Sequence, residues 1–205
     1  MKINTEQKIH ESFIDKLRSE TAERHQQLEK LPASTVLLSK EVTIDEYANY
    51  LIKMYAVMQD VEENIFPIVK EVMPDINKRI KTELIKKDLS VLKIEYSKKY
   101  DTVFSKNQLT ESFALGILYV TEGSTLGGRV ILKSLEQSLG LNGSKGASYF
   151  SGYGVDTSPM WKQFMDRLIN YEKATGTSAE IIAGAQFAFR AIYNHFNNRI
   201  QKNEN

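Results

Sequence analysis

The 205 residues of the chain suit one globular domain with a sizeable core, so we expect a single domain over residues 1–205. Lys and Arg number 27 against 26 Asp and Glu, and the formal net charge of +1 disfavours nucleic acid as a partner. The absence of Cys excludes disulfides, thiolate metal sites and a cysteine nucleophile. Residues 1–15 are too polar for a signal peptide, and no stretch approaches the roughly 18 apolar residues of a membrane span. We therefore expect a cytoplasmic protein with no membrane partner.

The first expected helix covers residues 5–30 and ends before Pro32. One face of it carries residues three or four positions apart, a spacing typical of a buried stripe. These residues are Phe13, Leu17, Thr21, His25 and Leu28.

The second expected helix opens at Thr43 and Glu46, which form a T-x-x-E capping box. Its apolar residues keep helical spacing at Tyr47, Leu51, Met54, Met58, Val61 and Ile65. Pro67 and Pro74 interrupt the chain after this helix. Residues 75–94 form the next helical segment, with lysines on one side and Ile76, Ile80, Leu84 and Leu92 on the other.

The fourth expected helix covers residues 110–139, and a Gly- and Ser-rich loop follows it. Ser158 and Pro159 form an N-cap and first-turn pair for a fifth helix. Thr177 and Glu180 form a capping box for the last one. No strand pair, solenoid repeat or low-complexity tract is evident, so the expected fold class is all-α, a single-domain multihelical bundle.

The fourth helix is unusual because Gly123, Gly127 and Gly128 lie in its interior. Each interior Gly costs a helix roughly 1 kcal/mol relative to Ala, so another interaction must offset the loss. One interpretation is a close helix crossing inside the core. The other is a planar ligand that lies against a kinked helix, with Gly123 and Gly127 on the face toward it.

His25 is a candidate ligand because it lies on the apolar stripe of the first helix. Glu29 follows at i+4, where its carboxylate can approach one ring nitrogen and orient the imidazole for a metal on the other. The alternatives are a packed core histidine and an exposed glutamate. His10 and His195 lack a comparable setting, and we interpret both as structural.

The sequence lacks the usual catalytic and metal motifs: no H-E-x-x-H, no paired E-x-x-H, no P-loop and no G-x-S-x-G elbow. With three His residues in the whole sequence, the His count also argues against a three-histidine zinc site. One axial His opposite a Gly-rich backbone surface is instead the arrangement that a haem needs, since the iron supplies the chemistry.

Four blocks of the sequence resemble the bacterial haem oxygenases, in particular the phytochrome-associated and iron-acquisition branch. LRSETAERHQQLE (17–29) resembles the proximal-helix motif of that family, and LYVTEGSTLGGRVI (118–131) resembles its distal-helix motif. RIKTELIKKDLSVL (79–92) and YFSGYGVDTSPMWKQF (149–164) are similar to two further blocks, whose Trp161 and glycines we interpret mainly as architecture. The blocks are in order and extend the resemblance over about residues 13–196.

The resemblance implies a haem oxygenase-like bundle with haem between the first helix and a kinked, Gly-rich distal helix. It also implies oxidative cleavage of haem to biliverdin with release of iron and carbon monoxide. His25 would be the axial ligand of the iron and Glu29 its hydrogen-bonding partner. Gly123 and Gly127 would abut the haem face, and residues 121–128 carry no cationic side chain to promote O–O cleavage.

The sequence departs from many members of the family at Ser124, where they carry an Asp that anchors a proton-delivering water network. We expect Ser124 or Thr125 to serve with ordered water. Arg18 matches a basic family position, and Lys133 follows the distal glycines. Both are candidate anchors for the haem propionates, with solvated surface charge as the alternative.

Three functions remain open at this point. The first is a haem oxygenase, which needs an external electron donor of unknown identity, such as a ferredoxin or a flavoprotein reductase, as its redox partner. The second is a non-catalytic haem carrier or sensor of the same fold. The third is a thiamine-salvage hydrolase or quinone-cofactor oxidase of the same superfamily, against which the lack of Cys and the three His residues argue.

Overall fold

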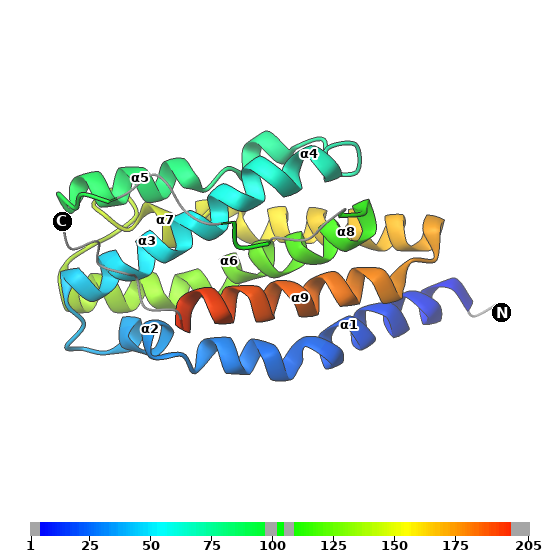
Figure 1. Cartoon of the computed structure of the whole chain (residues 1–205), viewed down its shortest axis with the longest axis horizontal. Coiled ribbons are helices and arrows are strands. Elements are labelled where there is room, and N and C mark those ends of the chain that lie inside the picture. Colours follow the sequence, from blue (N-terminus) through cyan, green and yellow to red (C-terminus); the bar gives the residue numbers. More distant parts are fainter. Residues whose placement is uncertain (1–4, 97–101, 105–108, 198–205) are drawn as a thin grey trace.

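A computed structural model of the chain describes residues 5–96, 102–104 and 109–197, and the regular secondary structure in these ranges is helical. Figure 1 shows the arrangement of the elements. In chain order they are α1 (Thr5–Glu29), α2 (Pro32–Thr35), the 3₁₀ turn η1 (Val36–Leu38), α3 (Ile44–Asp60), the π-helical segment η2 (Val61–Ile65), α4 (Phe66–Val69), the 3₁₀ turn η3 (Ile76–Arg79), α5 (Thr82–Val91), α6 (Glu111–Leu139), α7 (Ser148–Ser151), the 3₁₀ turn η4 (Gly154–Asp156), α8 (Thr157–Thr175) and α9 (Ser178–Asn197).

The starts of α3 and α6 follow from their capping residues. The Thr43 hydroxyl accepts a hydrogen bond from the amide of Glu46, whose carboxylate accepts one from the Thr43 amide, so the predicted capping box is confirmed. The Thr110 hydroxyl likewise accepts from the amide of Phe113 at the start of α6. The expectation for α8 is wrong by two residues, because its N-cap is Asp156.

The segment after Pro74 also differs from the expectation of one helix over residues 75–94. The chain forms η3, passes through an extended residue at Ile80 and only then enters α5. This break shifts the helical register, so α5 buries Ile85 and Leu89, while the expected Leu84 and Leu92 are only partly buried and the expected Ile76 is buried in η3. Ile80, expected on the apolar side, is 40% exposed.

The longest described helix, α6, packs against α9, and α1 packs against α9 as well (Figure 1). The contact between α6 and α9 depends on two glycines. A Cβ atom at Gly116 would overlap the carbonyl oxygen of Ile181, and one at Gly184 would overlap that of Phe113. The two backbones therefore touch directly, and any larger residue at either position would separate the helices.

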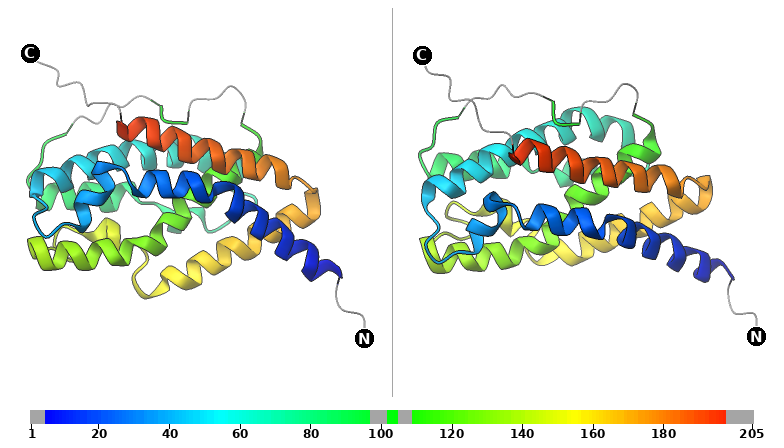
Figure 2. Two further views of the ribbon diagram at one scale, coloured as in Figure 1. Left: turned by 90° about the horizontal axis from the view of Figure 1, so that it is seen from below. Right: turned by 60° about the horizontal axis from the view of Figure 1, so that its bottom comes forward.

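Figure 2 shows that the axis of α6 changes direction along its length, as the sequence predicts for a Gly-rich helix. Helix α6 contains no Pro, and hydroxyl groups reach back to its backbone at the glycines. Ser124 donates to the Thr121 carbonyl and Thr125 to the Glu122 carbonyl, each over 2.7 Å. Such bonds, together with interior Gly, are the usual causes of a bend in a helix without Pro.

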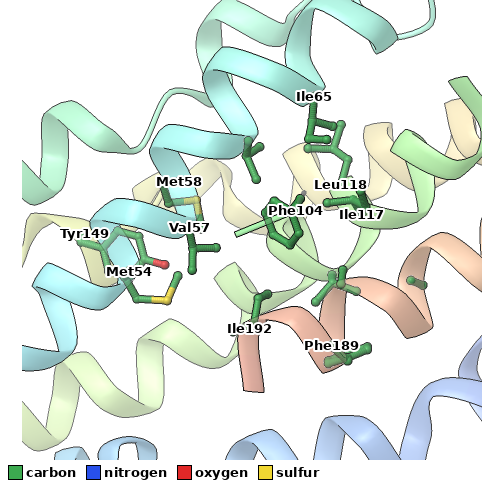
Figure 3. Packing of buried hydrophobic residues seen from close by; sticks show 14 of the residues in the cluster. Met54, Val57, Met58, Ile65, Phe104, Ile117, Leu118, Tyr149, Phe189 and Ile192 are labelled. Carbon is green, nitrogen blue, oxygen red and sulfur yellow. The ribbon is translucent and has the colours of Figure 1, made fainter. Parts of the chain in front are cut away.

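The hydrophobic core lies between α3, α6 and α9, and Figure 3 shows part of it at close range. Met54, Val57 and Met58 of α3 face Ile117 and Leu118 of α6 in this core. None of the described helices combines the length and the apolar composition needed to cross a membrane.

Candidate functional site

A cavity of about 660 Å³ lies between α1 and the middle of α6. Its volume falls within the range of roughly 300–1,000 Å³ that is usual for sites of small organic ligands. Helix α1 contributes Arg18, Thr21, Ala22, His25, Gln26, Leu28 and Glu29 to the lining, and α6 contributes residues 119–121, 123–128 and 131. The two sequence blocks that resemble the proximal and distal motifs therefore face each other across one space.

His25 lies on the α1 wall of this cavity. Its Nδ1 atom is 3.6 Å from Oε2 of Glu29, and its ring meets the edge of Phe189 at a centroid distance of 5.7 Å. The side chain is 56% exposed, because the stripe that buries Phe13, Leu17 and Thr21 reaches the open cavity at this turn. Among the contacts of the described residues none involves Nε2 of His25, so this nitrogen is available to bind a metal ion.

The three glycines of the distal segment have different surroundings. A Cβ atom at Gly128 would lie 2.9 Å from the carbonyl oxygen of Phe150 in α7, so this glycine serves helix packing. A Cβ at Gly123 would lie 3.4 Å from the indole ring of Trp161. A Cβ at Gly127 meets nothing within 4 Å and would project into open space. The close crossing thus explains Gly128, whereas Gly127 leaves room that a flat ligand can use.

Ser124 and Thr125 both line the cavity. Their hydroxyl protons are engaged with backbone carbonyls of α6, so the hydroxyl oxygens face the space as hydrogen-bond acceptors. Tyr149 lies on the same lining, and burial raises the pKa of its phenol well above the ordinary value. The phenol of Tyr149 therefore stays protonated and can act as a hydrogen-bond donor.

Of the two candidate propionate anchors, the structure brings one to the site. Arg18 is exposed and lines the cavity on the α1 side. Lys133 is exposed, six residues after Gly127 in α6, and is not part of the lining. Six residues of α-helix span about 9 Å, so only the extended lysine side chain could approach a ligand edge.

The other two histidines have different positions. The Nε2 atom of His195 lies 3.0 Å from the carbonyl oxygen of Lys53, and burial lowers the pKa of its imidazole. The structural interpretation of His195 is therefore confirmed. His10 lies in the stretch 5–12, whose side chains fall outside the description.

Several lining residues were not identified from the sequence. Trp161, interpreted above as architecture, lines the cavity opposite Gly123. Met54 and Met58 of α3 also reach the lining, although their helical spacing suggested only core positions, and so does Tyr50, which the expected stripe did not include. No local pattern separates a cavity wall from a core stripe, because both require apolar residues at the same period.

A buried ionic cluster behind the distal helix was also missed. The guanidinium of Arg79, whose side chain is 0% exposed, is paired with the carboxylate of Glu122, the residue directly before Gly123. Asp75 accepts hydrogen bonds from Arg79 and Arg167, and the Tyr153 hydroxyl donates to both oxygens of Glu122. Burial disfavours the charge of Arg79, but the facing carboxylates outweigh this effect and raise the pKa of its guanidinium.

These features fit a haem better than a directly ligated metal ion. The part of the chain that the structure describes holds no group of three or more His, Asp or Glu side chains able to bind a metal. His25 on α1 and the α6 surface at Gly127, where no side chain projects, line the same space, and aromatic residues also line it. Fold and cavity together define an all-α protein with a cavity between two helices that has room for a flat ligand.

Comparison with known proteins agrees with this class. A family model described as heme oxygenase matches residues 11–198, and the chain belongs to the haem oxygenase family. A protein named heme oxygenase from Xanthomonas campestris is 28% identical over 156 residues, which are 76% of this chain and 88% of the relative. The chain is accordingly an enzyme of the haem oxygenase class.

Solved structures share the fold. The haem oxygenase of Neisseria meningitidis, determined with NO and CO bound, has a TM-score of 0.72 at 22% identity and covers 92% of this chain and 94% of its own. That of Leptospira interrogans gives 0.69 at 17% identity, with 90% and 98% covered. A Synechocystis haem oxygenase in complex with haem gives 0.66 at 16% identity, with 90% of each chain covered. The all-α fold predicted from the sequence is thus confirmed.

Proposed function

We propose that the protein binds haem in the cavity between α1 and α6 and cleaves it oxidatively to biliverdin, iron and carbon monoxide. The observation that carries this proposal is the opposition of His25, with Nε2 directed to no protein group in the described residues, to the open helix surface at Gly127. Bound haem would supply the redox-active iron and would itself be the molecule oxidised.

The residues of α1 would bind the haem and orient its iron-binding imidazole. His25 would bind the iron through Nε2, while the Glu29 carboxylate beside Nδ1 fixes the ring orientation. Arg18 at the rim would pair with a propionate, and Lys133 would do so if its side chain extends toward the cavity. The space between His25 and α6 would then be left for the bound haem.

The residues of α6 confine the distal side. Gly123 and Gly127 would let α6 lie close to the haem, so that the helix backbone would confine the space on this side. The segment 121–128 carries no Lys, Arg or His, so it offers no charge that would promote O–O cleavage in the manner of a peroxidase. Ser124 and Thr125 would order water through their oxygens, with the phenol of Tyr149 as a nearby donor.

The reaction consumes electrons from outside the chain. We infer a ferredoxin or a flavoprotein reductase as the donor and the cytoplasm as the location, since a chain without Cys forms no disulfides and fits a reducing compartment. Neither nucleic acid nor a membrane is part of the proposal.

Two measurements test the proposal in sequence. Titration of the protein with ferric haem should produce a saturable Soret band, and addition of a reductant in air should then convert the haem to biliverdin.

Ser124→Ala tests the proton route. The formation of biliverdin should slow only mildly if backbone groups hold the water. Loss of biliverdin would show that the Ser124 side chain is needed for proton delivery.

A further inference from the structure

The buried side chain of Arg79 links two walls of the cavity without lining the cavity itself. Its Nη1 atom pairs with the carboxylate of Glu122 in α6, and its Nη2 atom donates to the carbonyl oxygen of Met160 in α8 over 3.3 Å. Glu122 precedes Gly123, and Met160 precedes Trp161. Both of these following residues line the cavity. One guanidinium therefore connects the Glu122 side chain of α6 with the Met160 backbone of α8, at the positions directly before the two lining residues.

The two walls meet where Arg79 ties them. The indole of Trp161 would lie 3.4 Å from a Cβ atom placed on Gly123. The α6 and α8 walls are therefore close to van der Waals contact at this end of the cavity. Trp161 stacks on Phe164 at a centroid distance of 5.5 Å and packs against Tyr119 at 5.6 Å. This packing restrains the indole on one side, while the position of α8 sets how far it reaches toward α6.

We propose that Arg79 is a positioning residue that holds the Gly123 and Trp161 walls at a fixed separation, and that this separation selects which edge of the porphyrin ring is cleaved. The inference rests on the proposed function. A flat ring in the cavity can slide or rotate in its own plane until an edge meets a rigid wall. Trp161 forms such a wall. Gly123 lies beside it on α6, the helix that would face the reacting side of the haem. A displacement of this wall would change how far the ring enters the cavity and how its edges lie relative to α6.

The test compares two arginines of the same cluster. Arg79→Lys keeps the positive charge, but a single ammonium cannot serve Glu122, Asp75 and the Met160 carbonyl in the geometry of the planar fork. Arg167→Lys is the matched control, because Arg167 also pairs with Asp75 and the structure gives it no contact to Glu122 or Met160 among the described residues. Lys is used in place of an apolar residue because Arg79→Met would leave the buried carboxylate of Glu122 without its cation.

The first readout needs no haem, because Trp161 is the only Trp of the chain and its fluorescence reports on this wall alone. In the haem-free protein, Arg79→Lys should shift the emission to the red and increase quenching by acrylamide, whereas Arg167→Lys should match the wild type. An unchanged emission in Arg79→Lys would overturn the proposal. Equal changes in both variants would also overturn it, since they would assign the effect to the cluster as a whole.

The second readout is the product. The ratio of the biliverdin isomers, separated by chromatography, should differ from that of the wild type in Arg79→Lys and equal it in Arg167→Lys. Trp161→Phe should alter the ratio too, and the double variant should add little to either single change, because both act on one wall. An unchanged ratio in Arg79→Lys would reject the selection of the edge. If the wild type forms no biliverdin, the proposed function fails, while the fluorescence comparison still decides whether Arg79 holds the wall.

Discussion

The Nδ1 atom of His25 lies 3.6 Å from Oε2 of Glu29, one helical turn further along α1, and both side chains line the cavity. This relationship gives the imidazole a direction, because a carboxylate on one ring nitrogen favours the tautomer that leaves the other as the ligand. It also explains why a half-exposed histidine is held in a defined position on an open wall.

His25→Ala should abolish the imidazole-ligated spectrum of the ferric haem complex, since no other described histidine lines the cavity. Absorption and electron paramagnetic resonance spectra of the reconstituted protein measure the change. His195→Ala is the control, because its ring is engaged with the Lys53 carbonyl, and it should keep the wild-type spectrum. The assignment is wrong if His25→Ala keeps an unaltered spectrum while His10→Ala or His195→Ala loses it.

Glu29→Ala should retain haem but raise its reduction potential, because the carboxylate beside Nδ1 favours the more positive ferric state. Loss of such a partner typically lowers affinity or activity by about 10–100-fold. Spectroelectrochemical titration measures the potential, and Glu23→Ala, an exposed residue of α1 outside the cavity lining, is the control. A potential equal to that of the wild type would mean that Glu29 is only a surface charge.

Gly127→Leu should block haem binding without harming the fold, because a side chain at this position enters open space. The substitution also removes an interior Gly, so the free energy of unfolding should stay the same or rise by up to about 1 kcal/mol. Gly128→Ala is the matched control: its Cβ would meet the Phe150 carbonyl oxygen at 2.9 Å, and the strain should destabilise the protein by roughly 1–3 kcal/mol. Haem titration and urea unfolding of both variants measure these effects. Tight haem binding by Gly127→Leu would show that the glycine does not serve the ligand.

Much of the fold could be predicted from the sequence because its signals are local. The capping box at Thr43 and the Thr110 cap fix helix starts, and the glycines in residues 110–139 indicate a helix that bends. The register of residues 75–94 could not be predicted in this way. Ile80 is extended where α5 begins, and the amides of Lys81 and Thr82 there donate to the carboxylate of Glu62, a contact over 19 and 20 positions that no spacing rule predicts.

The site was predictable only in part. His25 and Gly127 stood out because each breaks a local rule, as a polar residue on an apolar stripe and as a Gly inside a helix, and Glu29 followed from its i+4 spacing to His25. Trp161 and Arg79 follow their local patterns, and their roles arise from contacts over long sequence distances. Arg79 meets Glu122 from 43 positions away, a pairing that only the folded chain reveals.

Stability should depend on pH through Lys81, which is 4% exposed and whose Nζ lies 3.1 Å from the centroid of the Tyr153 ring. Burial lowers the pKa of Lys81 to about 8, despite the opposing effect of Glu122. Between pH 8 and the unfolded-state value near 10.5, the unfolded chain binds a proton that the folded chain does not, so stability rises with pH. Above about pH 10 the buried tyrosines reverse the trend, because their raised pKa values favour ionisation in the unfolded state.

The wild type should therefore gain about 2 kcal/mol of unfolding free energy between pH 8 and pH 10, measured by urea titration at each pH. Lys81→Met should flatten this rise and stabilise the protein at pH 7. The exposed Lys87→Met is the control and should leave the curve unchanged. A rise of equal size in Lys81→Met would exclude Lys81 as its source.

The most direct test of the account is a time course of the ferric haem complex in air after addition of ascorbate or a ferredoxin system, with catalase present. Catalase removes free peroxide, which can degrade haem without any catalytic protein. The account predicts that the Soret band disappears, that the broad red absorption of biliverdin rises, and that biliverdin is recovered on extraction. A Soret band that persists, with intact haem and no biliverdin extracted, would contradict the account and leave a haem carrier or sensor.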